Sequence, residues 1–326
     1  MRAIIFDNPG EPEVLKLGEF EKPVPKENEI LVKVGATALN RADTLQRKGK
    51  YPPPKGASPI LGMEIAGTVV RVGEKVSKWN TGEKVFGLIP GGGYAEYAVI
   101  HQDMAMNIPE NFSFEQAAAI SEVFLTAYQA LVRHGKLQKG EILLVHAGAS
   151  GVGTAAIQMA KEMGARVFVT ASKAKHQICL DLGAEKAIDY QSEDFSEKVL
   201  EYTNGKGVDL IIDFVAGPYL NQNVKSLAVD GRLVNLATLG GGKVGDFDIQ
   251  SILHKRLTII GSTLRSRTID YQIKLTHEFA AYALEKFSSG QIKPIIDSVF
   301  DWSEAAKAHS YMEANKNMGK IILKVS

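Results

Sequence analysis

The sequence contains a single cysteine, Cys179, among its 326 residues. One cysteine can neither form an internal disulfide nor supply a cysteine-cluster metal site, and a reducing compartment is where such a chain is expected. The first residues lack the apolar stretch and small-residue cleavage site of a secretory signal. No apolar run reaches the length of about 18 residues that a membrane-spanning helix needs. The sequence therefore predicts a soluble cytoplasmic protein without a membrane partner.

The chain also lacks a surplus of either charge, since 38 basic and 37 acidic residues give a formal net charge of +1. Nonspecific nucleic-acid binding normally requires a basic surplus or stripe, so nucleic acid is not an expected partner. Hydrophobic residues make up 45% and charged residues 23% of the chain, which excludes a disordered or fibrous protein. The length suggests about two domains.

Short apolar runs separated by Pro-rich and Gly-rich turns characterise residues 1–120. The predicted strands are Ala3–Phe6, Glu29–Val34, Ile65–Val72, Lys84–Leu88 and Tyr94–Val99. Short strands with this punctuation are typical of an all-β barrel or sandwich.

The pattern changes at about residue 112. Ser113, followed three residues later by Gln116 and an alanine-rich run, predicts a capped helix. Beyond it, strands at 141–146, 166–170, 210–215, 231–237 and 257–263 alternate with helices at 151–163, 173–182, 196–203 and 219–227. This alternation predicts a parallel α/β sheet. A helix near 271–289 follows, and the tail GKIILKVS is predicted to return to the first domain.

The most specific motif follows the predicted strand Ile142–His146. It reads Gly148-Ala149-Ser150-Gly151-Val152-Gly153, and a helix opens directly after it. Glycines at these places let the backbone turn tightly against a pyrophosphate, which the helix N-terminus favours. A ligand-free tight turn is the alternative. Because Thr154-Ala155 replaces the Lys-Ser/Thr pair of triphosphate-binding loops, the motif predicts a dinucleotide site formed by Gly148, Ser150, Gly151, Val152 and Gly153.

The end of the second strand of this unit indicates which dinucleotide binds. An NAD site places Asp or Glu there for the ribose 2′-hydroxyl, but the segment Thr170–His176 contains no carboxylate. It offers Ser172, Lys173 and Lys175, which can pair with a 2′-phosphate. Lysines that only solvate a helix turn are the alternative, although cations oppose the dipole at a helix N-terminus. NADPH is therefore the predicted cofactor, with Ser172 and Lys175 as its candidate ligands.

The chain as a whole resembles the medium-chain dehydrogenase/reductase superfamily and, within it, the zinc-independent, zeta-crystallin-like quinone oxidoreductases. The resemblance is carried by LGMEIAGTVVRVGEKV, GGGYAEYAV, HAGASGVGTAAIQMAK and GKIIL; LNRAD, PGGG and MEANKN are similar to the tumour-suppressor-inducible quinone oxidoreductase subgroup. It implies a GroES-like β-barrel domain at residues 1–122, completed by 296–326, and a doubly wound Rossmann domain at 123–295. It further implies an active site in the cleft between them and a homodimer formed through edge strands.

The zinc-dependent relatives in this superfamily hold their metal with a Cys and a His at the places of Asn40 and Met63. An amide and a thioether cannot replace a thiolate and an imidazole in a site that needs three protein ligands, so no metal is expected. Glu64, next to Met63, is expected to pair with Arg41 or with backbone groups.

The resemblance also implies site residues, some of which have a structural alternative. Asn40 is expected at the nicotinamide or substrate, or else as a turn cap; Tyr51 lines the quinone site or packs at the surface. Asn40, Tyr51 and Ser150 are the candidate catalytic residues. Cofactor contacts are further expected from Thr126, which could equally be helix interior, from Tyr190 beside the 2′-phosphate, and from Thr238, Leu239, Leu264, Arg265 and Asn317.

A site without a metal must deliver hydride to an acceptor that is already electrophilic, and quinones and conjugated carbonyls qualify. The leading interpretation is therefore an NADPH-dependent reductase of quinones. A reductase of conjugated aldehydes and ketones, and a non-catalytic NADPH-binding protein, are the alternatives. No side-chain acid is identified, and His146 is expected to be a structural histidine.

Overall fold

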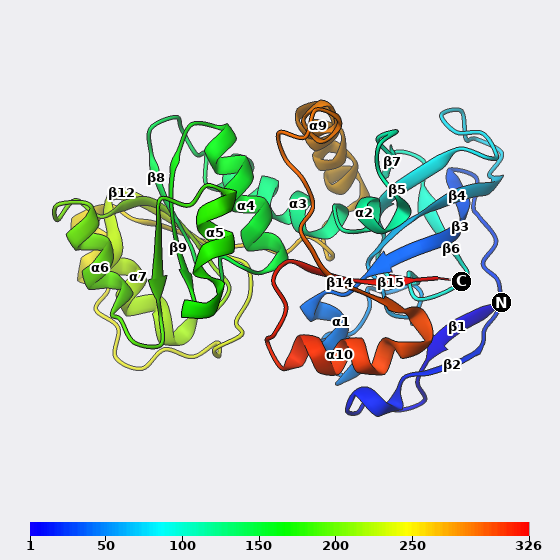
Figure 1. The fold of residues 1–326 in the computed structure, drawn as a ribbon, viewed down its shortest axis with the longest axis horizontal. Helices are drawn as coiled ribbons and strands as arrows, with labels where there is room; N and C mark the ends of the chain where they lie inside the picture. Colours follow the sequence, from blue (N-terminus) through cyan, green and yellow to red (C-terminus); the bar gives the residue numbers. More distant parts are fainter. Residues whose placement is uncertain (326) are drawn as a thin grey trace. The chain divides into compact units, whose positions relative to one another are not determined.

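The computed structural model describes residues 1–325, which divide into two compact units (Figure 1). Unit 1 comprises Met1–Leu125 together with the chain from Arg265 onward, and unit 2 comprises Thr126–Leu264. Within residues 1–325, no helix combines the length and apolar character needed to cross a membrane. The two units are described separately below.

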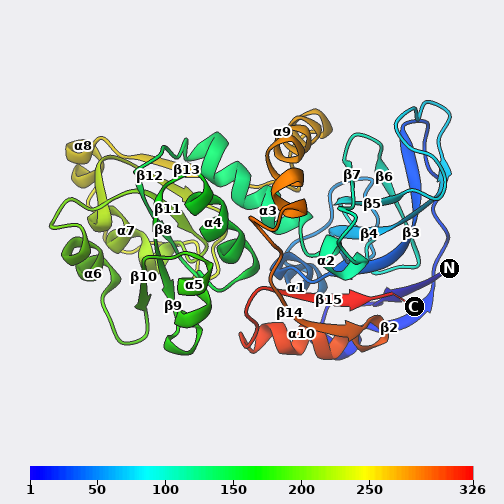
Figure 2. The same cartoon turned by 45° about the horizontal axis from the view of Figure 1, so that its top comes forward.

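Unit 1 is built on a mixed sheet in which β3, β4 and β5 are neighbours (Figure 2). The strand order is β14-β15-β3-β4-β5-β7, and β6 also pairs with β3. The strands are β3 (Glu29–Ala38), β4 (Glu64–Val72), β5 (Lys84–Leu88), β6 (Tyr97–His101), β7 (Ala105–Asn107), β14 (Ile296–Asp301) and β15 (Lys320–Lys324). A separate hairpin joins β1 (Arg2–Ile5) to β2 (Lys16–Glu19).

The C-terminal strand β15 lies antiparallel to β3, with Ile322 opposite Ala38. Residues Ile321, Ile322 and Leu323 are fully buried, so the apolar tail completes the core of unit 1. The prediction that the tail returns to the first domain is therefore confirmed. This pairing places Lys320, the first residue of β15, close to the end of β3.

Five helices accompany the sheet of unit 1: α1 (Arg41–Arg47), α2 (Phe114–Ala118), α3 (Ser121–Tyr128, which runs into unit 2), α9 (Ile269–Ser288) and α10 (Ala305–Glu313). The capping box before α2 is confirmed, since Gln116 N donates to Ser113 Oγ and Ser113 N to the Gln116 side chain. The helices α1 and α10 were not predicted, because short helices with polar faces give little periodicity.

The long helix α9 belongs to unit 1 by its contacts. The rings of Phe279 and Phe287 pack on Phe124, with centroids 6.4 and 5.0 Å away. The contact boundary therefore falls at residue 264, whereas the cofactor-binding domain implied by the family resemblance extends to residue 295. That domain boundary stays a prediction, and the aromatic packing of α9 favours the earlier one.

Unit 2 contains a six-stranded parallel sheet with the order β10-β9-β8-β11-β12-β13. In chain order this is 3-2-1-4-5-6, the doubly wound arrangement that reverses direction between the first and fourth strands. The α/β fold class is thus confirmed. The strands are β8 (Ile142–Val145), β9 (Arg166–Ala171), β10 (Lys186–Asp189), β11 (Val208–Asp213), β12 (Leu227–Asn235) and β13 (Thr258–Gly261).

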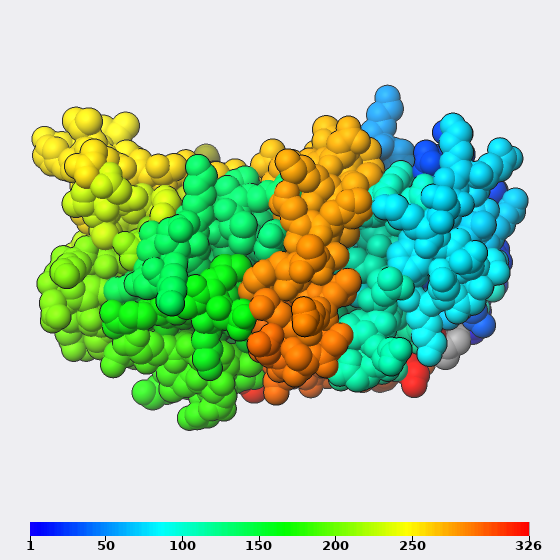
Figure 3. Space-filling view, turned by 90° about the horizontal axis from the view of Figure 1, so that it is seen from above, coloured from blue at the N-terminus to red at the C-terminus, as the bar shows by residue number. Residues whose placement is uncertain are grey.

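Helices cover both faces of this sheet, with α4 packed on α5 and, in a second group, α6 and α8 each packed on α7. Their bounds are α4 (Gly151–Glu162), α5 (His176–Leu182), α6 (Phe195–Tyr202), α7 (Leu220–Ser226) and α8 (Gln250–Lys255). Leu144, Phe168 and Ile211 belong to the buried core of the unit. The yellow segment around α8 lies at the surface of unit 2 in Figure 3.

Candidate functional site

The glycine turn of unit 2 connects β8 to the N-terminus of α4. Gly148 N donates to Thr170 O at 3.0 Å, and Ser150 Oγ accepts from Gly153 N at 3.0 Å as the N-cap of α4. A Cβ on Gly153 would lie 2.4 Å from the Ala147 carbonyl oxygen. The backbone is therefore packed too closely for a side chain, as a turn that presents its amides to a pyrophosphate requires.

The carboxyl edge of the parallel sheet gathers most of the other predicted cofactor residues. Because parallel strands end at one edge, loops that follow them lie side by side, and ligands bind where the strand order reverses. The glycine turn follows β8, which together with β11 forms that reversal point. Five further candidates follow other strands at the same edge: Ser172, Lys175, Tyr190, Thr238 and Leu239. Leu264 lies three residues beyond β13, and Thr126, on α3, is the first residue of unit 2.

The neighbouring strands β9 and β10 bring the 2′-phosphate candidates into one corner of that edge. Ser172 and Lys175 follow β9, and Tyr190, which is 46% exposed, follows β10. Burial raises the pKa of the Cys179 thiol to about 12, and the charge of Lys175 opposes this rise. A hydrogen bond from Ser192 and, more weakly, the charge of Lys173 lower the pKa of Asp189. Of the two lysines, Lys173 therefore has a carboxylate in its vicinity.

A buried polar network lies beneath this edge. The His146 ring is fully buried, with Nδ1 2.9 Å from Thr170 Oγ1 and Nε2 2.7 Å from Asn223 Oδ1. Asn223 Nδ2 in turn donates to Asp213 Oδ2 at 3.0 Å. Burial lowers the pKa of His146, so the ring is neutral and donates through Nε2. Both ring nitrogens have protein partners, which agrees with a structural histidine.

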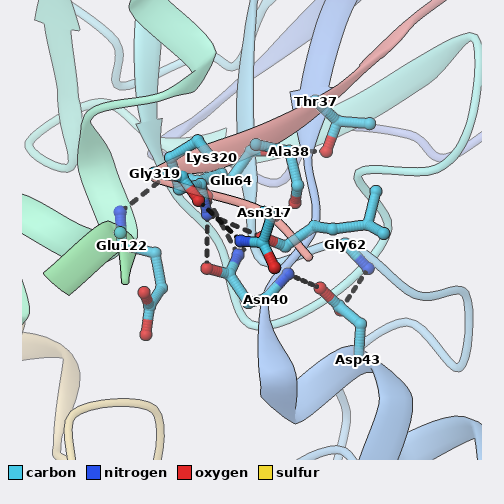
Figure 4. Close-up of polar contacts among 12 residues, drawn as sticks. Thr37, Ala38, Asn40, Asp43, Gly62, Glu64, Glu122, Asn317, Gly319 and Lys320 are labelled. Carbon is cyan, nitrogen blue, oxygen red and sulfur yellow. Dashed lines mark hydrogen bonds and ion pairs between the residues drawn. The ribbon is translucent and has the colours of Figure 1, made fainter. Parts of the chain in front are cut away.

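The polar centre of unit 1, which we define as Asn40, Glu64 and Lys320, lies where β3, β4 and β15 meet (Figure 4). Lys320 Nζ donates to Leu39 O at 2.7 Å, to Asn40 Oδ1 at 2.6 Å and to Glu64 Oε1 at 2.8 Å. Asn40 Nδ2 also donates to Glu64 Oε1 at 2.9 Å, and Glu122 N donates to Glu64 Oε2 at 2.8 Å. Every member of the centre is more than nine-tenths buried, and the carboxylate is held by an ammonium, an amide and a backbone N–H.

Two further side chains border the polar centre. Asp43 accepts from Asn40 N at 2.8 Å and from Gly62 N at 3.0 Å. Burial raises the pKa of Asp43 to about 6, although both hydrogen bonds oppose the rise. Asn317, a predicted cofactor residue, donates to Gly319 O at 2.8 Å and lies near the polar centre in Figure 4.

Of the two partners expected for Glu64, the backbone alternative is confirmed, since Oε2 accepts from Glu122 N. Arg41 is not its partner: Glu64 pairs with Lys320, while the Arg41 guanidinium bonds the Asn315 side chain at the surface. Lys320 is a site residue that was not predicted from the sequence. The available signal was a lysine opening an apolar strand that was expected to return to the first domain, since a buried lysine must find an anion.

Tyr51 and Arg265 also lie in unit 1, beside one another. The guanidinium carbon of Arg265 is 5.3 Å from the centroid of the Tyr51 ring. Burial raises the pKa of the Tyr51 phenol, and the charge of Arg265 opposes the rise. The predicted site residues are thus divided: Asn40, Tyr51, Arg265 and Asn317 stand in unit 1, and the others in unit 2.

Among residues 1–325, no three His, Cys, Asp or Glu side chains are arranged to hold a metal ion. At the polar centre the positive charge beside Glu64 is the ammonium of Lys320. Asn40 and Met63 occupy the places where the zinc-dependent relatives carry Cys and His, so the residues present do not fit a zinc site.

Two family models match the chain. The alcohol dehydrogenase GroES-like domain matches residues 26–110, and the zinc-binding dehydrogenase domain matches residues 151–286. The quinone oxidoreductase of Homo sapiens is 33% identical over 331 residues, which cover 99% of this chain and 97% of the relative.

Solved structures that resemble the chain over its whole length differ in cofactor and reaction. An NAD-dependent alcohol dehydrogenase has a TM-score of 0.89 and 32% identity, with 100% of both chains covered. The CurK enoyl reductase has a TM-score of 0.88 and 29% identity, covering 100% of this chain and 99% of its own. A mycobacterial protein complexed with NADPH has a TM-score of 0.89 and 29% identity, covering 99% of this chain and 100% of its own. Because these similar structures differ in cofactor and reaction, the cofactor and substrate of this chain must be inferred from its own residues.

Proposed function

Because this chain belongs to the medium-chain dehydrogenase/reductase superfamily, in its quinone oxidoreductase branch, we propose that it is an NADPH-dependent reductase of quinones that works without zinc. The family establishes an oxidoreductase with a nucleotide-binding fold. NADPH, quinones and independence of zinc are the finer assignments that we infer, and each is supported by residues described above.

The end of β9 carries the cofactor proposal. Ser172 and Lys175 stand where an NAD enzyme places a carboxylate for the ribose 2′-hydroxyl, and both can pair with a phosphate. The closely packed turn at Gly148–Gly153 suits a pyrophosphate, and α4 offers it the positive end of a twelve-residue helix. When bound, NADPH would supply a hydride. The contacts inferred for Thr126, Tyr190, Thr238, Leu239, Leu264, Arg265 and Asn317 remain predictions.

The polar centre of unit 1 supports a reaction without zinc. Lys320 already neutralises Glu64, and the amide of Asn40 is bonded to both of them. Without a Lewis acid to polarise a weak electrophile, the acceptor must itself attract hydride. Quinones meet this requirement, and the identity to the human quinone oxidoreductase supports the same class.

A reductase of conjugated aldehydes and ketones is the second candidate, favoured by the resemblance to the CurK enoyl reductase. Conjugated carbonyls are also electrophilic without a metal. A non-catalytic NADPH-binding protein is the third candidate, and it would keep the glycine turn and Lys175 while consuming no cofactor.

A steady-state screen decides between these functions. NADPH oxidation is followed with ortho-quinones, para-quinones and 2-alkenals, in the presence and absence of a chelator. We expect the highest kcat/KM with quinones and no effect of the chelator. Faster turnover of 2-alkenals would identify the enone reductase, and no oxidation with any acceptor would identify the binding protein.

The cofactor proposal has its own test in Lys175→Ala. Loss of the ammonium removes its pairing with the 2′-phosphate, so the Kd for NADPH rises by about tenfold or more, as expected for a charge-assisted bond worth about 1.5–3 kcal/mol. The Kd for NADH stays nearly unchanged. Lys173→Ala is the matched control, because that lysine is more exposed and lies near Asp189. Equal weakening of both nucleotides by Lys175→Ala would contradict the assignment.

We further propose a cytoplasmic homodimer. The free Cys179 is buried, which suits a reducing compartment. Among the described strands, β13 pairs only with β12 and leaves Ile259 41% exposed at the sheet edge. An open edge strand can pair with a second copy. Light scattering on wild type and Ile259→Lys tests this, with a dimer expected for the wild type and a monomer for the variant.

A further inference from the structure

The side chain of Arg265 is held rigidly inside unit 1. The residue is 9% exposed. Its Nε and Nη2 donate to Pro90 O at 2.8 and 2.6 Å, and Nη2 also donates to Gln46 Oε1 at 2.8 Å. The guanidinium is therefore fixed on one side by a backbone carbonyl and a side-chain amide.

The other nitrogen of the same group is not satisfied. Nη1 of Arg265 is buried and has no hydrogen-bond partner among residues 1–325. Asp43 influences the guanidinium electrostatically, but the two are not bonded. Ser121 Oγ and Ser298 Oγ of unit 1 are also buried without a hydrogen-bond partner, but they are neutral. A buried charged donor left unpaired costs more than a neutral one, so Nη1 of Arg265 points to a partner that arrives with a ligand.

The groups around Nη1 of Arg265 indicate the chemistry of the ligand that would bind it. The ring of Tyr51 lies 5.3 Å from the guanidinium carbon, and an aromatic ring is a suitable neighbour for a flat, conjugated molecule. The phenol of Tyr51 remains protonated because burial raises its pKa. Arg265 thus offers a fixed cationic N–H next to an aromatic ring, a combination suited to an oxygen that carries negative charge on a conjugated ring.

We propose that Nη1 of Arg265 binds the carbonyl oxygen of the acceptor and stabilises the charge that develops there during reduction. This inference rests on the proposed function. A hydride, carrying two electrons, adds to the quinone, which is reduced to the hydroquinone monoanion while the nucleotide is oxidised. A proton from water then converts the monoanion to the hydroquinone. Arg265 acts at the oxyanion, where a preorganised donor is worth most.

Arg265→Met tests the proposal against a matched control. We expect kcat/KM for quinones to fall by about 100-fold, as for loss of one oxyanion donor. A Kd for NADPH that stays nearly unchanged separates this role from the cofactor contact that the resemblance implies for Arg265. Arg267→Met makes the same substitution at an exposed arginine that lies 4.8 Å from the Tyr271 ring, and it leaves turnover unchanged. Equal turnover by wild type and Arg265→Met would overturn the proposal.

Two further measurements separate this role from a purely structural one. In Arg265→Ala, millimolar guanidinium ions should restore turnover, since they can enter the vacated space; a variant that is merely misfolded would not respond. In the absence of turnover, 4-nitrophenolate serves as a stable analogue of the hydroquinone monoanion. It should bind the wild type, bind Arg265→Lys weakly, and not bind Arg265→Met.

The phenolate measurement also distinguishes failure of the inference from failure of the proposed function. If the wild type oxidises no NADPH with quinones but binds 4-nitrophenolate through Arg265, the quinone reductase proposal fails and the anion site stands. If quinones are reduced and the phenolate binds wild type and Arg265→Met alike, the reductase proposal stands and the role of Arg265 is overturned.

Discussion

Each unit buries a carboxylate, and the two are held in different ways. In unit 1, Glu64 is fully buried and meets the ammonium of Lys320 at 2.8 Å. In unit 2, Asp213 is 1% exposed and accepts from Val215 N, Ala216 N and Asn223 Nδ2, at 2.7, 3.1 and 3.0 Å. One anion is neutralised by a cation and the other is solvated by neutral donors.

The difference matches what the two positions are proposed to do. Two of the neutral donors of Asp213 come from the loop after β11 and the third, Asn223 Nδ2, comes from α7. The carboxylate therefore shapes the carboxyl edge that is proposed to receive a polyanionic cofactor. The ion pair of Glu64 joins β4 to β15 and leaves the polar centre, which also includes Asn40, without a net charge. Removing Lys320 leaves the charge of Glu64 buried without a counter-charge, whereas replacing Asp213 by an amide removes a single hydrogen-bond acceptor.

The largest expected effect is that of Lys320→Met. The substitution leaves Glu64 buried without a counter-charge, and the free energy of unfolding should fall by about 3–5 kcal/mol. Urea unfolding measures the loss. Adding Glu64→Gln to Lys320→Met should recover part of it, because the double variant buries no bare charge. A single variant as stable as the wild type would show that the pair contributes nothing net.

A smaller loss is expected from Asp213→Asn in unit 2. The new NH2 group faces a backbone N–H that previously had an acceptor, and one unsatisfied buried donor costs about 1–3 kcal/mol. No opposite charge is stranded, so the loss should stay below that of Lys320→Met in the same urea assay. The reverse order would contradict the contrast between the two carboxylates.

Much of unit 2 could be predicted because its signals are local. The glycine turn, the strand before it and the helix after it occupy one continuous segment, and the spacing alone indicates a dinucleotide site. The strand β10 was not predicted, since Lys186–Asp189 is short and carries a charge at both ends.

The polar centre of unit 1 could not be predicted in the same way. Lys320 and Glu64 are 256 residues apart, and no local pattern states which buried cation meets which anion. Arg265 illustrates the same limit. It was predicted from resemblance as a cofactor residue, but its bonds to Pro90 and Gln46 come from elements more than 170 positions earlier in the chain. Pairings across such separations depend on the assembled sheet.

The smallest expected effect is a gain in stability from Ala216→Gly. Ala216 has φ 68° and ψ −117°, a conformation that strains any residue with a Cβ by about 1–3 kcal/mol, and its N–H is aimed at Asp213. Glycine removes the strain but adds about 0.5–1 kcal/mol of chain entropy to the unfolded state, so the net gain should be about 1 kcal/mol in the urea assay. Ala160→Gly, inside α4, should instead lose at least about 1 kcal/mol. If Ala216→Gly also lowered the free energy of unfolding, the conformation of Ala216 would not be strained. Asp213 would then shape the carboxyl edge without forcing the backbone of Ala216 into an unfavourable conformation.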